Sequence, residues 1–84
     1  MHETLTMNDG TILAGHAFES DGRLYAYLDD STMSDAFTIM NDPQKTIRIA
    51  ANRYGEVEVY EGYNRLRSIS LEDNNTISVV LKKV

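Results

Sequence analysis

Polar and apolar side chains alternate along most of this chain, in short runs that turn residues separate. A period of two places successive side chains on opposite faces of an extended backbone, so it predicts half-buried β-strands. Asp9-Gly10 and Asp21-Gly22 favour the positive φ angles of tight hairpin turns. We predict strands over residues 4–7, 11–19, 23–28, 46–51, 56–60, 63–71 and 77–81.

The alternation also predicts which side chains share a face. Leu24, Ala26 and Leu28 lie opposite Tyr25 and Tyr27 in the third run. The other sets that share a face are Ile12, Ala14, His16 and Phe18; Ile47, Ile49 and Ala51; Val57 and Val59, with Glu56, Glu58 and Tyr60 opposite; and Ile77, Val79 and Leu81.

Two strands carry further signals. Leu66 and Ile69 are three residues apart, so strict alternation cannot bury both, and a bulge near Arg67-Ser68 would restore the register. Lys82 and Lys83 follow the last apolar run, and their charges suit an exposed edge of the sheet.

One segment departs from the period of two and predicts a short α-helix. Its apolar residues recur at i, i+3, i+4 and i+7, and they are Met33, Ala36, Phe37 and Met40. Asp30 or Ser31 can cap its start, and Asn41-Asp42-Pro43 ends it because the residue before proline avoids the helical region.

The element order is therefore β-β-β-α-β-β-β-β, an α+β fold of mostly antiparallel strands. Frequent turns between short strands predict a rolled sheet, a small barrel or a sandwich, with the one short helix against an opening. The 84 residues suffice for a single domain, 1–84. Its core must be thin, and oligomerisation is one way to complete it.

Charge and composition disfavour or exclude several classes of function. Thirteen Asp and Glu against eight Lys and Arg give a net charge of −5, which repels phosphate backbones and anionic membranes. The lack of cysteine excludes disulfides and thiolate metal sites. No apolar run reaches the ~20 residues of a spanning helix, and the first residues lack signal-peptide features. We expect a cytoplasmic protein, or a virion component if phage-derived, that contacts no membrane.

The residues that could carry chemistry form no recognised site. His2 and His16 would need Glu3, Glu19 or Asp21 as further metal ligands, and no metal-binding spacing is present. Glu56 and Glu58 share a face, but an acidic stripe opposite Arg48 explains them better than acid–base catalysis. Asp29, Asp30 and Asp35 lack the spacing of a calcium loop. We expect no enzyme activity, metal or cofactor.

Five of the seven aromatic residues are tyrosines. Tyr25 and Tyr27 face away from Leu24 and Leu28, and tyrosine exposed on a sheet is favoured at protein interfaces. The alternative to an interface role is that these tyrosines form a second apolar layer under the helix. The predicted partner contacts are Tyr25, Tyr27, Tyr60 and Tyr63. Stacking of nucleobases is the other use of such rings, with assistance from Arg23, Arg48, Arg53, Arg65 and Arg67.

The run Leu24-Tyr25-Ala26-Tyr27-Leu28, the helix Met33–Met40, and Tyr60-Glu61-Gly62-Tyr63 followed by residues 77–83 resemble small uncharacterised prophage-encoded proteins of Gram-positive bacteria. In those chains a hairpin, a short helix and an "EGY"-like turn recur in this order. The resemblance implies a phage structural or accessory role, such as a tail-associated component, and no catalysis.

Two hypotheses of function follow. The first is a non-enzymatic assembly or interaction protein that binds itself, as a homo-oligomer, or another protein through strand edges and tyrosines. The alternative is a small barrel-like module that binds single-stranded nucleic acid or another ligand, although the net charge disfavours nucleic acid.

Overall fold

A computed structural model describes residues 3–7, 10–29, 32–40, 48–72 and 75–83. The strands and the helix follow one another in the predicted order, β-β-β-α-β-β-β-β, which confirms the mostly antiparallel α+β fold. The elements are β1 (Thr4–Thr6), β2 (Ile12–Ser20), β3 (Arg23–Leu28), α1 (Met33–Met40), β4 (Arg48–Arg53), β5 (Glu56–Glu61), β6 (Arg65–Leu71) and β7 (Ile77–Lys82).

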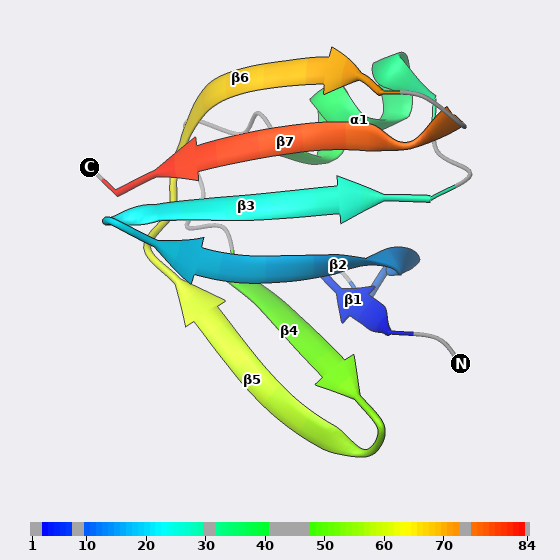
Figure 1. The fold of residues 1–84 in the computed structure, drawn as a ribbon, viewed down its shortest axis with the longest axis vertical. Helices are drawn as coiled ribbons and strands as arrows, with labels where there is room; N and C mark the ends of the chain where they lie inside the picture. Colours follow the sequence, from blue (N-terminus) through cyan, green and yellow to red (C-terminus); the bar gives the residue numbers. More distant parts are fainter. Residues whose placement is uncertain (1–2, 8–9, 30–31, 41–47, 73–74, 84) are drawn as a thin grey trace.

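The strands form one open seven-stranded sheet in the order β5-β4-β1-β2-β3-β7-β6, and every pairing is antiparallel. Its edges are β5 and β6, so the predicted barrel closure is not found. The edge position predicted from Lys82 and Lys83 is wrong, because β7 lies between β3 and β6. Figure 1 shows that the β4–β5 hairpin turns away from the β2-β3-β7-β6 part, so the sheet is strongly curled.

The curl is centred on β2, which pairs with β1 over Ile12 to Ala14 and with β3 from Gly15 onward. A Cβ atom at Gly15 would stand 2.3 Å from the backbone oxygen of Tyr27 and 3.3 Å from a methyl group of Leu5. No side chain fits such a gap, so glycine permits the close approach of backbones at the bend.

Local sequence signals explain the turns and the bulge. Asp21 and Gly22, and likewise Tyr54 and Gly55, have the paired positive φ angles of two-residue hairpins. The register of β6 against β7 shifts between Leu66 and Ser68, which confirms the predicted bulge. The shift leaves Leu66 and Ile69 both packed against the core.

The core lies on the concave side of the curled sheet, with α1 against β6 and β7. The predicted faces of β3 and β7 are confirmed, since Leu24, Ala26, Leu28, Ile77, Val79 and Leu81 are all buried. The apolar pair of β5 behaves differently. Val57 and Val59 are 59% and 41% exposed, whereas Tyr60 is buried, because its register partner is the core residue Ile49.

The predicted strand 11–19 also turns its expected apolar set outward. Ala17 is buried, whereas Ile12, Ala14 and His16 are exposed and Phe18 is half-buried. Residues 46–47 of the predicted fourth strand lie outside the described residues, as does the turn at residues 8–9.

The helix covers the predicted residues, but its cap differs. Thr32 Oγ1 accepts the N–H of Asp35 at 3.0 Å, which satisfies one of the free donors of the first turn. The predicted caps Asp30 and Ser31 and the stop at residues 41–43 lie outside the described residues. Ala36 is buried and Phe37 is 48% exposed. The part of the chain described here contains no helix with the length and apolarity to cross a membrane.

Candidate functional site

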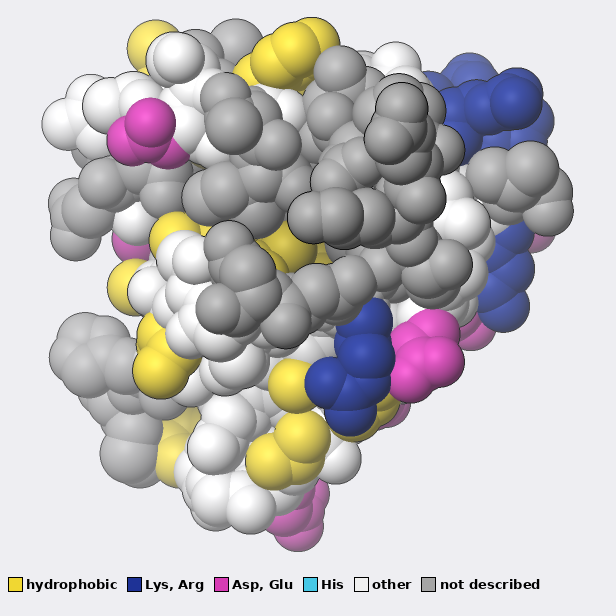
Figure 2. Space-filling view, turned by 180° about the vertical axis from the view of Figure 1, so that it is seen from behind, with side chains coloured by type: hydrophobic (Ala, Val, Ile, Leu, Met, Phe, Trp, Pro, Cys, Tyr) yellow, Lys and Arg dark blue, Asp and Glu magenta, His cyan; other side chains and the backbone are white. Residues whose placement is uncertain are grey.

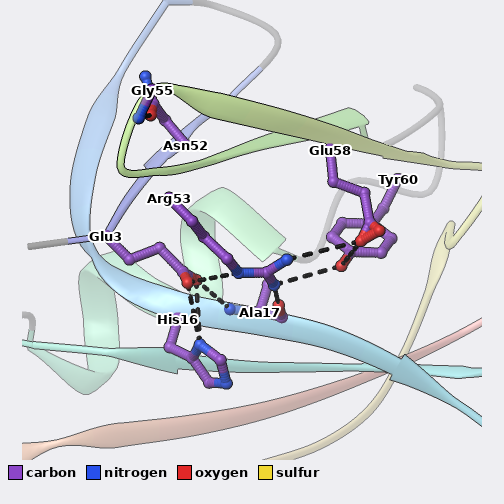
Figure 3. A network of polar contacts seen from close by, with 8 residues as sticks. All are labelled: Glu3, His16, Ala17, Asn52, Arg53, Gly55, Glu58 and Tyr60. Atoms are coloured by element: carbon purple, nitrogen blue, oxygen red, sulfur yellow. Dashed lines mark hydrogen bonds and ion pairs between the residues drawn. The ribbon is translucent and has the colours of Figure 1, made fainter.

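A polar network lies beside β2, next to the residue at which β1 begins. Among the described residues, β1 pairs only with Ile12 to Ala14 of β2, so no described strand pairs with Ala17 on that side. The Glu3 carboxylate accepts the N–H of Ala17 at 2.8 Å, and the Arg53 guanidinium donates to the carbonyl oxygen of Ala17. These side chains therefore satisfy both backbone groups of Ala17 (Figure 3).

The same groups join the N-terminal strand to the β4–β5 hairpin. Arg53 Nε donates to Glu3 at 2.6 Å, and Arg53 Nη1 lies 3.5 Å from the carboxylate of Glu58. Arg53 also donates to the Tyr60 hydroxyl at 3.3 Å, and that hydroxyl donates to Glu58 at 2.7 Å. The side chains of Glu3 and Arg53 are only 14% and 30% exposed, so this pair is well shielded from water.

The network perturbs three pKa values. Burial acts to raise the pKa of Glu3, but hydrogen bonds from His16, Ala17 and Arg53 outweigh it and hold the pKa below its ordinary value. The pKa of Arg53 is raised, first by its hydrogen bond with Tyr60 and then by Glu3. Burial, followed by the hydrogen bond to Glu58, raises the pKa of Tyr60. At neutral pH the site thus holds a carboxylate, a guanidinium and a neutral phenol.

A group of four rings lies on the outer, convex face beside this network, and we call it the aromatic cluster: His16, Phe18, Tyr25 and Tyr27. The rings of Phe18 and Tyr25 are nearly parallel, with centroids 5.2 Å apart. Tyr27 stacks beside Phe18 at 6.2 Å and beside His16 at 6.4 Å. With its proton on Nδ1, His16 donates to Glu3 at 3.1 Å, so the cluster and the polar network are connected.

An open hollow of about 550 Å³ lies between the free side of β2 and the end of β5. Its lining residues are His16, Phe18, Glu19, Arg53, Glu58, Val59 and Tyr60. The guanidinium and carboxylates of the network are directed at one another (Figure 3). This arrangement braces the hairpin against β2.

The structure separates the four tyrosines predicted to contact a partner. Tyr25 and Tyr27 are half-buried on the outer face, where part of each ring stays accessible. Tyr60 and Tyr63 are 7% and 1% exposed and belong to the core, so they are not surface contacts of this chain. Their burial follows from the register of β5 and from the turn after it, at Gly62, which has a φ of +86°.

The predicted acidic stripe is also rearranged. Glu58 pairs with Arg53, whereas Arg48 pairs with Glu61 at 3.0 Å. His2 lies outside the described residues, and His16 meets Glu3 but neither Glu19 nor Asp21 through a described contact. Within the described ranges, no group of three His, Asp or Glu side chains is placed to hold a metal ion.

Sequence reasoning missed the Glu3–Arg53 pair. The two residues are 50 positions apart, and no local pattern connects them. The signal that could have found them is the register of β1 against β4, which puts residue 3 beside residue 53 once the strand order is known.

Comparisons with protein-family models, with curated proteins and with solved structures found no match.

Proposed function

We propose that this chain is a non-enzymatic interaction protein that assembles with a second copy of itself through an uncharged part of its outer sheet face. We call this part the uncharged face, and it consists of Thr4, Thr6, Ile12, Ala14, Ala50, Asn52, Val57 and Val59. The registers align it in two rows across four strands, Val59–Ala50–Thr6–Ile12 and Val57–Asn52–Thr4–Ala14.

The observation that supports this proposal most is the exposure of large apolar side chains on this face. Ile12 is 66%, Val57 59% and Val59 41% exposed. Large apolar side chains exposed on one uncharged face indicate an interaction site, and a folded chain gains free energy by covering them.

The charge distribution of this face permits a second copy as the occupant. Two chains with a net charge of −5 repel each other, so self-association requires a face without carboxylates. The uncharged face meets this requirement, and the Arg48–Glu61 ion pair borders it as a polar rim. A two-fold contact between two such faces is self-complementary.

The prophage resemblance belongs to the same proposal. A subunit of a phage particle, such as a tail-associated component, works by repeated contacts between copies rather than by catalysis. Detection of this protein in purified phage particles, induced from a bacterial host that encodes it, would support this role. Its absence from those particles would contradict the role.

The self-association is tested by light scattering coupled to size exclusion over a range of concentrations. We expect a dimer or larger species for the wild-type chain and a shift to monomer for Val57→Glu, which brings like charges together across a two-fold axis. Leu71→Glu is the matched control, because Leu71 is 61% exposed but lies on β6. A wild-type chain that stays monomeric at high concentration would refute the proposal, as would an equal effect of the control.

A further inference from the structure

The cations of this acidic chain are unevenly distributed. Arg48 and Arg53 pair with glutamates. The other described cations form no ion pair with the described part of the chain, and they are Arg23, Arg65, Arg67, Lys82 and Lys83. All five lie where β3 and β6 begin and β7 ends, and Figure 2 shows dark blue side chains gathered along that side of the molecule.

Three of these cations form a row across the outer face. The registers pair Arg23 with Lys82 and Lys82 with Arg65, so they stand side by side on β3, β7 and β6. Neighbouring strands are ~4.8 Å apart, so the row spans about 10 Å. We call Arg23, Lys82 and Arg65 the cation row.

The aromatic cluster adjoins the cation row on the same face. Tyr25 is two residues from Arg23 on β3, and its register partners are Phe18 on β2 and Val80 on β7. On this face β3 carries only Arg23, Tyr25 and Tyr27, and β7 carries only serine, valine and lysine. No carboxylate therefore interrupts the path from the cations to the rings on these two strands.

We propose that this face binds single-stranded nucleic acid, with phosphates on the cation row and bases stacked on Tyr25 and its neighbours. Single-strand binding sites combine cations that follow the backbone with aromatic side chains on which bases stack. Four-stranded antiparallel sheets with aromatic residues on their open face bind RNA in this manner. The site lies on the β2-β3-β7-β6 part of the sheet and is independent of the proposed self-association.

The net charge of −5 predicts that nucleic acid is disfavoured, but local charge decides binding at this face. The Debye length at physiological salt is ≈ 8 Å, so carboxylates on the distant β5 edge are largely screened. The cations of the row lie within about one Debye length of their neighbours, so their fields add. An acidic peptide would satisfy the cations, but its carboxylates would not stack on the accessible parts of the rings of the aromatic cluster.

The proposal is tested by fluorescence anisotropy with a labelled oligothymidylate of about 12 nucleotides, titrated with the full chain at several salt concentrations. Three phosphate contacts predict a slope of log affinity against log salt of about −2. Lys82→Gln and Arg65→Gln should each reduce the slope by about 0.7 and weaken binding. Tyr25→Leu keeps an apolar side chain on the sheet and should lower affinity about 10-fold with little change in slope, because stacking is lost.

Arg48→Gln is the matched control, since it removes the same charge from the other half of the sheet, and its affinity should equal that of the wild type. Circular dichroism confirms that each variant is folded. Failure of the wild type to bind at low salt would overturn the proposal, and so would an equal loss in Arg48→Gln. Competition by polyglutamate as strong as that by unlabelled oligonucleotide would instead assign the face to an acidic protein. Binding by a monomeric chain would support this proposal even if the self-association failed its own test.

Discussion

Replacing Arg53 by methionine should destabilise this protein more than any other single change to a surface charge. Methionine keeps the length and apolar stem of the side chain but removes the guanidinium. The Glu3 carboxylate then keeps its burial and loses its ion-pair partner, and the carbonyl oxygen of Ala17 loses its donor. The β4–β5 hairpin loses its polar link to β2 at the same time.

The structure sets the expected magnitude. Removing one partner of a fully buried ion pair costs about 3–5 kcal/mol, whereas exposed pairs contribute about 0–1 kcal/mol. Side-chain exposures of 14% for Glu3 and 30% for Arg53 place this pair between the two limits. We expect a loss of about 2–3 kcal/mol in the free energy of unfolding. For a domain of this size, that corresponds to a decrease in Tm of roughly 10–20 °C.

Urea denaturation followed by circular dichroism measures this loss. Arg48→Met is the matched control, because the Arg48–Glu61 pair is exposed by 51% and 62% and should contribute less than about 1 kcal/mol. A double-mutant cycle with Glu3→Gln should give a coupling energy of about 1–2 kcal/mol between the two side chains. If Arg53→Met unfolds within about 0.5 kcal/mol of the wild type, the network does not brace the hairpin and the reasoning is refuted.

Three further predictions concern the same region. Because the pKa of Glu3 is lowered in the folded state, its contribution to stability is fully present above about pH 4.5 and is lost as the pH falls through the pKa of the folded protein. The urea midpoint should therefore decline less steeply between pH 6 and 3 in Glu3→Gln than in the wild type. An equal decline in the two proteins would contradict this. Gly15→Ala should lower the free energy of unfolding by at least about 2 kcal/mol, because the added Cβ meets the backbone of Tyr27. Ala14→Ser on the same strand is the control and should change the free energy of unfolding little. An equal loss in the two variants would argue against the clash. Tyr60→Phe should lose about 1 kcal/mol in thermal denaturation, since its hydroxyl joins Arg53 to Glu58, and an unchanged Tm would show that this link is unimportant.

Much of the fold could be predicted because its signals are local. The alternation of β3 and β7, the Asp21-Gly22 turn and the bulge after Leu66 each depend on residues within a few positions of one another. The helix was predicted with its observed bounds for the same reason. Its cap at Thr32 was missed by one residue, because the neighbouring Asp and Ser are stronger N-cap residues than Thr.

The candidate sites could not be predicted, because they depend on which strands become neighbours. The cation row requires β7 to lie between β3 and β6, whereas its lysines suggested a sheet edge. Val57 and Val59 have the spacing of a buried pair, but the register against β4 buries Tyr60 on the opposite side. A period of two defines two faces of a strand without saying which one meets the core.

The sequence by itself determined the type, order and turns of the elements, because side-chain alternation and backbone preferences act over a few residues. Only the tertiary structure decided the strand order, the outward face of each strand, and the meeting of Glu3 with Arg53 across 50 positions. The physical reason is that these features follow from how the whole sheet curls to bury one continuous core, and that curl depends on all seven strands together.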